Sequence, residues 1–426
     1  MGRSGYFSAS SIFAAGVFCL VAALFFGGKA IAAGHVLLLL SFVLAFTLRG
    51  KVEFAWRSLP RSAVFLCAFV IIAVISVVVN LSLIEEPFDH FKKLRYFLLT
   101  LLALAVPSLV SVLLQEKVRR DLLVLAWLLP MVFAVGCGLI GYATGSHPLR
   151  GQDVIHIGRV SGLYGQVMTF AYTLQFTVLT LFVFAFSSSW WEKVTRLPRW
   201  VVWVALGIAA IGLYFTFTRG AMIGALAGLA TFAAFRSRAL FIGICMIGIV
   251  AVGLAYFQGA RYLKLESPIR QNQWKAAALS FVERPIFGLG FRNFERHSAE
   301  LKERYGFQKD LVRKLGSKPE RKYFMSHAHN NFLESFASMG ILGGLVFTGF
   351  CYFWLREAWR SRYASLWVPL IVAFVLSGLF ENTFFDSEVL NCILLIYFFS
   401  QVVMRLERQE KAHSEPEASS SSDSSS

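Results

Sequence analysis

Residues 62–79, with the sequence SAVFLCAFVIIAVISVVV, decide the fold class because they form a long apolar run without a charged side chain. A helix needs about 20 predominantly apolar residues to cross the hydrocarbon core of a bilayer, which is roughly 30 Å thick. The whole chain has the same character, with 57% hydrophobic residues, 15% charged residues and a mean hydropathy of +0.61. Ordinary soluble domains do not reach these values. The sequence therefore predicts an integral membrane protein.

About twelve comparable stretches follow one another along the chain. They are residues 10–26, 31–48, 62–79, 94–114, 122–142, 165–187, 200–218, 220–235, 239–257, 329–355, 366–384 and 388–404. This pattern predicts an all-α polytopic fold with about 12 transmembrane helices, nine in residues 1–257 and three in residues 328–404. Residues 258–327 separate the two groups as a large loop. The serine-rich end of the chain, residues 405–426, is expected to be a disordered tail.

The six cysteines all lie inside predicted spans. Packing is the default role of this small, polarizable side chain at such positions. Their spacing matches neither a CxxC metal motif nor a disulfide framework on the outer face.

Basic residues are distributed unevenly between the two sides of the predicted bundle. If the amino terminus is cytoplasmic, the inward segments carry 19 Lys and Arg, and the short outward segments carry seven. This bias fits the positive-inside rule, and it also makes the 405–426 tail cytoplasmic. The outward loop 258–327 has 15 basic and seven acidic residues, a net +8 that topology does not require. The excess suggests an anionic partner such as lipid phosphates rather than nucleic acid; a solvated loop that is basic by chance is the alternative.

The outward loop has the composition of a folded segment. Ser267 and Pro268 read as the N-cap and first position of a helix. Residues 269–282 then resemble an amphipathic helix carrying Trp274, Leu279 and Phe281, and further helices are expected over 291–305 and 309–315. We expect these helices to lie on the membrane surface over the bundle.

Three short motifs carry candidate chemistry. In the first, Arg219 interrupts an apolar run within TFTRGA, residues 216–221. An arginine at or near membrane depth is energetically costly and marks a functional site by default. The alternative is an arginine at a tight interhelical turn whose side chain reaches the interface.

In the second motif, ERPIFGLG at residues 283–290, Arg284 is followed by Gly288 and Gly290. Glycines let backbone amides approach an anion, and an arginine offers a bidentate fork. A simple turn explains the glycines equally well, and only the basic surroundings favour anion binding.

The third motif, SHAHNNFLE at residues 326–334, places His327 and His329 where the loop enters the tenth span. A histidine at this boundary suits general base catalysis near neutral pH. We expect neighbouring guanidinium groups to lower its pKa and keep the imidazole neutral. A structural, hydrogen-bonding histidine is the alternative.

Metal binding is the rival interpretation of the two histidines. They are two positions apart, whereas a helical zinc pair is separated by one turn. The outward segments also lack an Asp-x-Asp cluster. We therefore predict a reaction without an essential metal or other cofactor, in which arginines neutralise phosphate charge. Arg159 and Glu381 are weaker candidates that could line the same cavity, and a helix-end ion pair would explain Glu381 as well.

Taken together, these motifs resemble the O-antigen ligases, within a wider group that includes O-antigen polymerases. The resemblance rests on Thr218-Arg219-Gly220, on Arg284-Pro285 with Gly288 and Gly290, and on His329-Asn330 with Phe332 and Leu333, in this order around the largest outward loop. It implies a GT-C-like membrane enzyme of the bacterial inner membrane with a periplasmic loop and active site. The implied reaction is metal-independent, inverting transfer of O-antigen from undecaprenyl pyrophosphate to the lipid A-core of lipopolysaccharide.

Carried over by position, Arg219 and Arg284 would bind the donor pyrophosphate, with Arg159, Gly288 and Gly290 contributing. His329 would be the base, because the family motif places the histidine directly before an asparagine. His327, Asn330 and Glu381 would have supporting roles. An O-antigen polymerase, a protein O-oligosaccharyltransferase and, from another class, a membrane transporter are the alternatives, and the oligomeric state is not predicted.

Overall fold

The structure is a computed structural model that describes residues 2–49, 55–149, 158–164, 166–257, 268–307 and 327–414. Its helices are α1 (Gly2–Phe26), α2 (Gly28–Arg49), η1 (Trp56–Ser58), α3 (Arg61–Val79), η2 (Leu81–Leu83), α4 (Pro87–Ala105), α5 (Pro107–Gln115), α6 (Lys117–Thr144), α7 (Val167–Phe186), α8 (Ser188–Val194), α9 (Trp200–Phe215), α10 (Arg219–Arg236), α11 (Arg238–Phe257), α12 (Pro268–Glu283), α13 (Phe294–Arg304), α15 (Asn331–Trp359), α16 (Ala364–Ser377) and α17 (Ser387–Ser414). Within these ranges, seven helices are long and apolar enough to cross a membrane: α1, α2, α3, α6, α7, α15 and α17. The predicted all-α, multi-pass membrane fold is confirmed.

The predicted spans coincide with helical structure, with two corrections. Helix α16 ends at Ser377, so the last seven residues of the span predicted over 366–384 are not helical. The span predicted over residues 94–114 is two helices, because α4 ends at Ala105 and α5 begins at Pro107. Proline disfavours helical backbone in the residue before it. Val106 accordingly has φ −119° and ψ 75°, which ends α4.

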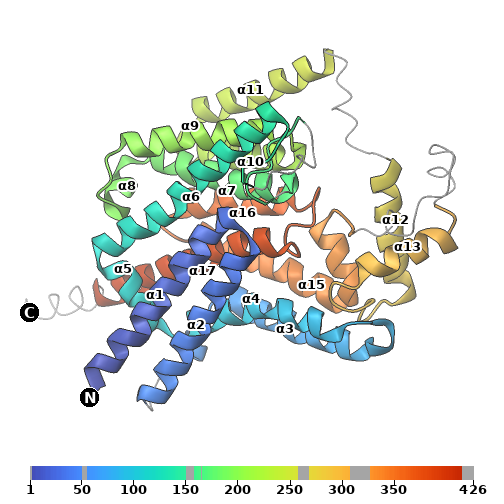
Figure 1. The fold of residues 1–426 in the computed structure, drawn as a ribbon, viewed down its shortest axis with the longest axis horizontal. Coiled ribbons are helices and arrows are strands. Elements are labelled where there is room, and N and C mark those ends of the chain that lie inside the picture. The colour runs from blue at the N-terminus through green and yellow to red at the C-terminus, as the bar shows by residue number, and fades with distance from the viewer. Residues whose placement is uncertain are drawn as a thin grey trace, which may run out of the picture.

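The two ends of the chain lie at the same end of the bundle, and α12 and α13 lie at the other end (Figure 1). The final helix is longer than expected, since α17 continues to Ser414 and the tail predicted from residue 405 is helical over its first ten positions. Glu407 helps to hold this extension, because it accepts hydrogen bonds from the Ser361 hydroxyl and the Arg362 amide. Residues 415–426 lie outside the described part of the chain.

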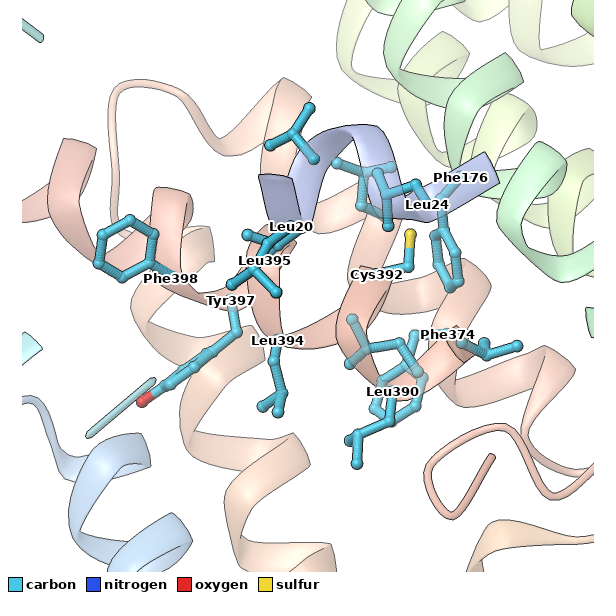
Figure 2. Close-up of a cluster of buried hydrophobic side chains, with 14 of the residues drawn as sticks. Leu20, Leu24, Phe176, Phe374, Leu390, Cys392, Leu394, Leu395, Tyr397 and Phe398 are labelled. Carbon is cyan, nitrogen blue, oxygen red and sulfur yellow. The ribbon is translucent and has the colours of Figure 1, made fainter. Parts of the chain in front are cut away.

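The carboxy-terminal helix runs through the middle of the apolar core. In Figure 2, Leu390 and Leu394 of α17 lie among Leu24 of α1, Phe176 of α7 and Phe374 of α16. The cysteines are free thiols, and Cys392 of α17 is buried in this cluster. The packing role predicted for the cysteines therefore fits their positions.

Helix α10 packs unusually close to its neighbours through glycines spaced four residues apart. A Cβ atom at Gly224 would lie 2.6 Å from the Gln175 amide nitrogen of α7, and one at Gly228 would lie 2.7 Å from Leu179. Small residues at this spacing let membrane helices approach through their backbones. The stripe begins at Gly220, so the first turn of α10, which carries Arg219, is held against α7.

The helices of the large loop, α12 and α13, pack on the amino-terminal half of α15. The packing of α12 does not use the apolar face that was expected from its sequence. The contact face of α12 consists of small residues, Ala276, Ala277 and Ser280, and the Ser280 hydroxyl donates to the Ala337 carbonyl at 3.0 Å. Trp274, Leu279 and Phe281 are only partly buried. The helix predicted at 309–315 lies outside the described residues.

Candidate active site

Two histidines and one glutamate form a hydrogen-bonded group at the entrance to α15. The Nδ1 atom of His329 lies 2.7 Å from Oε1 of Glu381, and the Nε2 atom of His327 lies 2.9 Å from the same oxygen. The two imidazole rings are 4.3 Å apart. Glu381 follows α16, so the structure brings together residues that are more than fifty positions apart in the sequence. The sequence indicated Glu381 only as a weak candidate. Its contact with both histidines is the main feature of the site that the structure adds to the sequence analysis.

The asparagines that follow His329 hold this group in place. Asn330 is the N-cap of α15, and its side-chain oxygen accepts hydrogen bonds from the amides of Phe332 and Leu333. Asn331 donates to the Thr383 hydroxyl and accepts from the Phe384 amide. The supporting role predicted for Asn330 is thus helix capping. Its neighbour, Asn331, ties the loop that carries Glu381 to α15.

Backbone strain is concentrated around the candidate site. Within the described residues, three non-glycine residues have positive φ: His329 at 48°, Phe217 at 49° and Arg292 at 62°. Such conformations cost of order 1–3 kcal/mol each and persist where the surrounding structure imposes them. Phe217 lies two residues before Arg219, so two of the three strained positions belong to motifs selected from the sequence.

The charges of the group differ from the expectation. Burial opposes ionisation of Glu381, but hydrogen bonds from His327 and His329 outweigh it, and the pKa of this carboxyl lies well below its usual value. Burial also opposes the charge on His327, yet the hydrogen bond to Glu381 raises its pKa. We expected guanidinium groups to lower the histidine pKa. For His327 this expectation was wrong, because its charged neighbours are the carboxylates of Glu381, Glu334 and Glu295.

An ionised Glu381 fixes the hydrogen-bonding state of both rings. A carboxylate only accepts hydrogen bonds, so the hydrogen lies on Nδ1 of His329 and on Nε2 of His327. In the neutral form of His329, the lone pair is then on Nε2, on the side of the ring away from Glu381. That atom has the chemistry of a general base.

Two arginines lie next to one another beside this group. The Arg159 side chain donates to the Thr216 carbonyl at 2.7 Å and to the Thr218 hydroxyl at 2.9 Å. Burial, with the nearby charge of Arg219, lowers the pKa of Arg159. Arg219 itself is exposed at the first position of α10. A pair of close, like charges with an exposed member favours binding of an anion.

The glycine after Arg219 connects the arginine pair to Glu381. A Cβ atom at Gly220 would meet the Tyr172 hydroxyl and would lie 3.5 Å from Cβ of Phe380, the residue before Glu381. The structure thus places Arg159, Arg219 and the histidine group around one end of α7.

The second sequence motif has a different setting. Arg284 is exposed, and its Nη1 atom donates to the Asn80 side chain at 2.9 Å. The amides of Gly288 and Gly290 donate to the carbonyls of Arg284 and Ser338, so neither is available to an anion. A Cβ atom at Gly288 would lie 2.5 Å from the Ser338 backbone. The structure therefore explains these glycines by close packing on α15.

The backbone next to Arg284 meets α15 well beyond the start of that helix. The Pro285 carbonyl accepts a hydrogen bond from the amide of Ile341, which is ten residues after Asn331, the first residue of α15. This is about 15 Å along a helix. A role for Arg284 in donor binding remains a prediction.

The histidine group also has the composition of a metal site. One ligand atom from each of His327, His329 and Glu381 lies within 4.8 Å of the others. Glu381 has a second, buried oxygen, Oε2, without a hydrogen-bond partner. Two imidazoles and a carboxylate are ligands that zinc accepts. The spacing argument against a metal therefore overlooked a third ligand from a distant segment, and metal independence stays a prediction.

Tyr172, Asn331 and Glu334 are site neighbours that the sequence did not single out. Glu334 is buried, and its carboxylate accepts from the Ala328 amide between the two histidines. One signal was present in α7, where Thr169, Thr173 and Gln175 are buried polar residues inside an apolar helix. Polar groups at such depth commonly mark functional regions.

The fold and the site define a helical membrane protein with paired guanidinium groups and an acid–histidine group at one end, an arrangement with the chemistry to hold an anion beside a general base. Comparison with known families makes this specific: residues 203–348 match the family model described as O-antigen ligase. The match supports assignment of the chain to the O-antigen ligase family, the family that its motifs resemble. The matched segment contains Arg219, Arg284, His327 and His329, whereas Glu381 lies outside it. No curated protein matches the chain.

Proposed function

We propose that this protein is an O-antigen ligase that transfers O-antigen polysaccharide from undecaprenyl pyrophosphate to the lipid A-core of lipopolysaccharide. One observation carries the proposal: His329 is hydrogen-bonded to an ionised Glu381 beside the Arg159–Arg219 pair, and the family match covers His329 and Arg219. The enzyme would be a multi-pass protein of the bacterial inner membrane. Its active site would face the periplasm, where the donor and acceptor lipids meet.

The arginines would act on the donor. As the bond between the anomeric carbon and the pyrophosphate oxygen breaks, negative charge develops on the leaving group. Fixed cations at that position stabilise the transition state more than the ground state. Arg219 and Arg159 are the proposed pyrophosphate ligands, and Arg284 would join them if its exposed side chain leaves Asn80.

The histidine would act on the acceptor. An acceptor hydroxyl attacks the anomeric carbon from the face opposite the pyrophosphate, which inverts the configuration. Its proton passes to Nε2 of His329 while Glu381 stabilises the imidazolium that forms. The products are the new glycoside and undecaprenyl pyrophosphate. His327, whose pKa is raised, would hold a proton next to Glu381 and balance its charge.

The test is a reconstitution with purified protein, undecaprenyl-pyrophosphate-linked O-antigen and lipid A-core. A ligase should produce core capped with polymer, and a polymerase should extend one lipid-linked chain by another repeat. In cells, deletion of a ligase should leave uncapped core and lipid-linked polymer. Deletion of a polymerase should instead leave core capped by a single repeat.

The remaining alternatives give other products. A protein O-oligosaccharyltransferase would glycosylate a protein acceptor in place of lipid A-core. A transporter would move lipid-linked sugar without forming a glycosidic bond. Absence of capped core in the complete reconstitution would reject the ligase assignment.

A further inference from the structure

A second polar site lies about one membrane thickness away from the histidine group. It is a cavity of about 400 Å³ between the segment before α3, the break between α4 and α5, and the last turns of α17. Arg405, on its wall, is 18 residues after Ser387, the first residue of α17. This separation is roughly 27 Å along a helix. The cavity is therefore at the end of the bundle where both chain ends lie (Figure 1).

Two arginines line this cavity, and neither has a carboxylate partner among the residues that the structure describes. Arg405 donates through Nη1 to the Leu104 carbonyl at 3.1 Å and through Nη2 to the Ser58 hydroxyl. Arg408 uses only its Nε atom, which donates to Met404 of its own helix at 3.3 Å. Arg405 and Arg408 are three positions apart on α17, so their side chains lie on the same face of the helix. Two neighbouring positive charges thus face the cavity, and Arg408 has both terminal nitrogens available within the described part of the chain.

The nearest acids on the same helix are engaged elsewhere. Glu407 accepts from Ser361 and Arg362 and pairs with Lys411, and Glu410 pairs with Arg362. These contacts turn both carboxylates toward the connection between α15 and α16. Two guanidinium groups on one helix face repel each other, and an anion in the cavity would relieve this repulsion.

The rest of the cavity indicates what kind of anion fits. Its walls include the apolar residues Leu59, Leu104, Pro107 and Val402. Such walls favour contact with the acyl chains of a lipid over binding of a hydrated free ion. Gln401 also lines the cavity, and its side-chain nitrogen donates to Ser62 and Glu357. Basic pockets between membrane helices at the cytoplasmic side are suited to anionic lipid head groups.

We propose that this cavity binds an anionic glycerophospholipid, with the phosphate on Arg408 and Arg405 and acyl carbons along the apolar walls. Arg405 already closes the carbonyl end of α4, so a lipid phosphate there would join α17 to the α4–α5 break. The site is separate from the proposed active site and does not depend on the reaction.

The test uses the purified, delipidated full-length protein in detergent, with lipid binding measured by native mass spectrometry. The probes are phosphatidylglycerol, phosphatidylcholine with the same acyl chains, and inorganic phosphate as competitor. We expect phosphatidylglycerol to bind about tenfold more tightly than phosphatidylcholine, the effect of one charge-assisted hydrogen-bonded contact. Arg408→Gln should remove this preference, and Arg408→Lys should retain part of it.

Arg360→Gln is the matched control, because Arg360 is an exposed arginine at the same end of the bundle and outside the cavity. This variant should bind phosphatidylglycerol as the wild type does. The proposal is overturned if the wild-type protein binds both lipids equally, or if Arg408→Gln and Arg360→Gln have the same effect. Displacement of the lipid by equimolar inorganic phosphate would also overturn it, since the site would then recognise the free ion.

Discussion

At the scale of single residues, His329 is the position on which the proposed chemistry depends most. His329→Ala removes the base and should lower the transfer rate by about 10²–10⁴-fold. His329→Asn is the sharper variant, because asparagine tolerates the positive φ of 48° that this position requires. Both are measured as initial rates with purified lipids at equal protein level. His327→Gln serves as the comparison and should cost less; transfer at the wild-type rate by His329→Asn would remove His329 from the mechanism.

The pH dependence of transfer tests the role of Glu381. A general base must be deprotonated, so the rate should rise with pH. Glu381 raises the pKa of His327, so His327 keeps its proposed proton to higher pH than a free histidine, and loss of that proton should lower the rate again at high pH. Glu381→Gln removes the carboxylate and should shift this falling limb to lower pH. It should also lower the plateau rate by about 10²-fold or more, because the ring loses its anionic partner.

The quantity to measure is kcat as a function of pH for both proteins at saturating donor. A purely structural role for Glu381 would reduce the amount of folded protein and leave the position of the falling limb unchanged. A falling limb that moves to higher pH in Glu381→Gln would contradict the proposed charge arrangement.

Removal of metal ions by a chelator tests whether the histidine group acts as a general base or as a metal site. If transfer is metal-independent, dialysis against EDTA should leave the rate unchanged. Added Zn²⁺ should inhibit, because coordination would occupy the lone pairs of His327 and His329. Elemental analysis of the purified protein accompanies the rate measurement. Loss of activity after dialysis and its recovery with one metal ion would show that the prediction of metal independence is wrong.

At the scale of elements, the kink in α15 connects the large loop to the bundle. Gly340 has φ 67° and ψ −162°, and the amide of the next residue, Ile341, donates to the Pro285 carbonyl at 2.7 Å. Only glycine adopts this backbone conformation readily. The kink therefore determines where Arg284 and the loop that follows it meet α15.

Gly340→Ala should destabilise the protein by about 1–3 kcal/mol or more, because the new Cβ is strained and would meet the backbone of Ile286. The measurement is thermal unfolding in detergent, together with transfer activity. Gly136→Ala is the matched control in α6, since a Cβ atom there meets nothing within 4 Å. An equal melting temperature for the two variants would contradict the role assigned to the kink.

At the scale of the whole molecule, the proposed orientation places α13 and the histidine group outside the cytoplasm. In a cysteine-free background, Glu303→Cys on α13 and Lys193→Cys on α8 introduce thiols at exposed positions. A membrane-impermeant maleimide should label Glu303→Cys in right-side-out spheroplasts. It should label Lys193→Cys only after permeabilisation. The reverse pattern would invert the topology and reject a periplasmic active site.

The sequence by itself determined the class of fold and the main candidates for the site. Long apolar runs such as residues 62–79 must be buried in lipid or protein, and a charged residue such as Arg219 between two runs is conspicuous. Apolar runs are a local property of the sequence, which is why each predicted span corresponds to one principal helix. The exception is the span predicted over residues 94–114, which Pro107 divides into two helices.

Only the tertiary structure decided which of these residues meet. Glu381 becomes the partner of His329 because α15 and α16 pack side by side and Asn331 ties their loop, contacts between segments that no local pattern specifies. Gly288 and Gly290 locally resemble an anion-binding turn, but Gly288 packs against the backbone of α15 and the amide of Gly290 donates to the Ser338 carbonyl of the same helix. The sequence specifies the chemistry of each side chain, but which side chains come into contact depends on the packing of the whole chain.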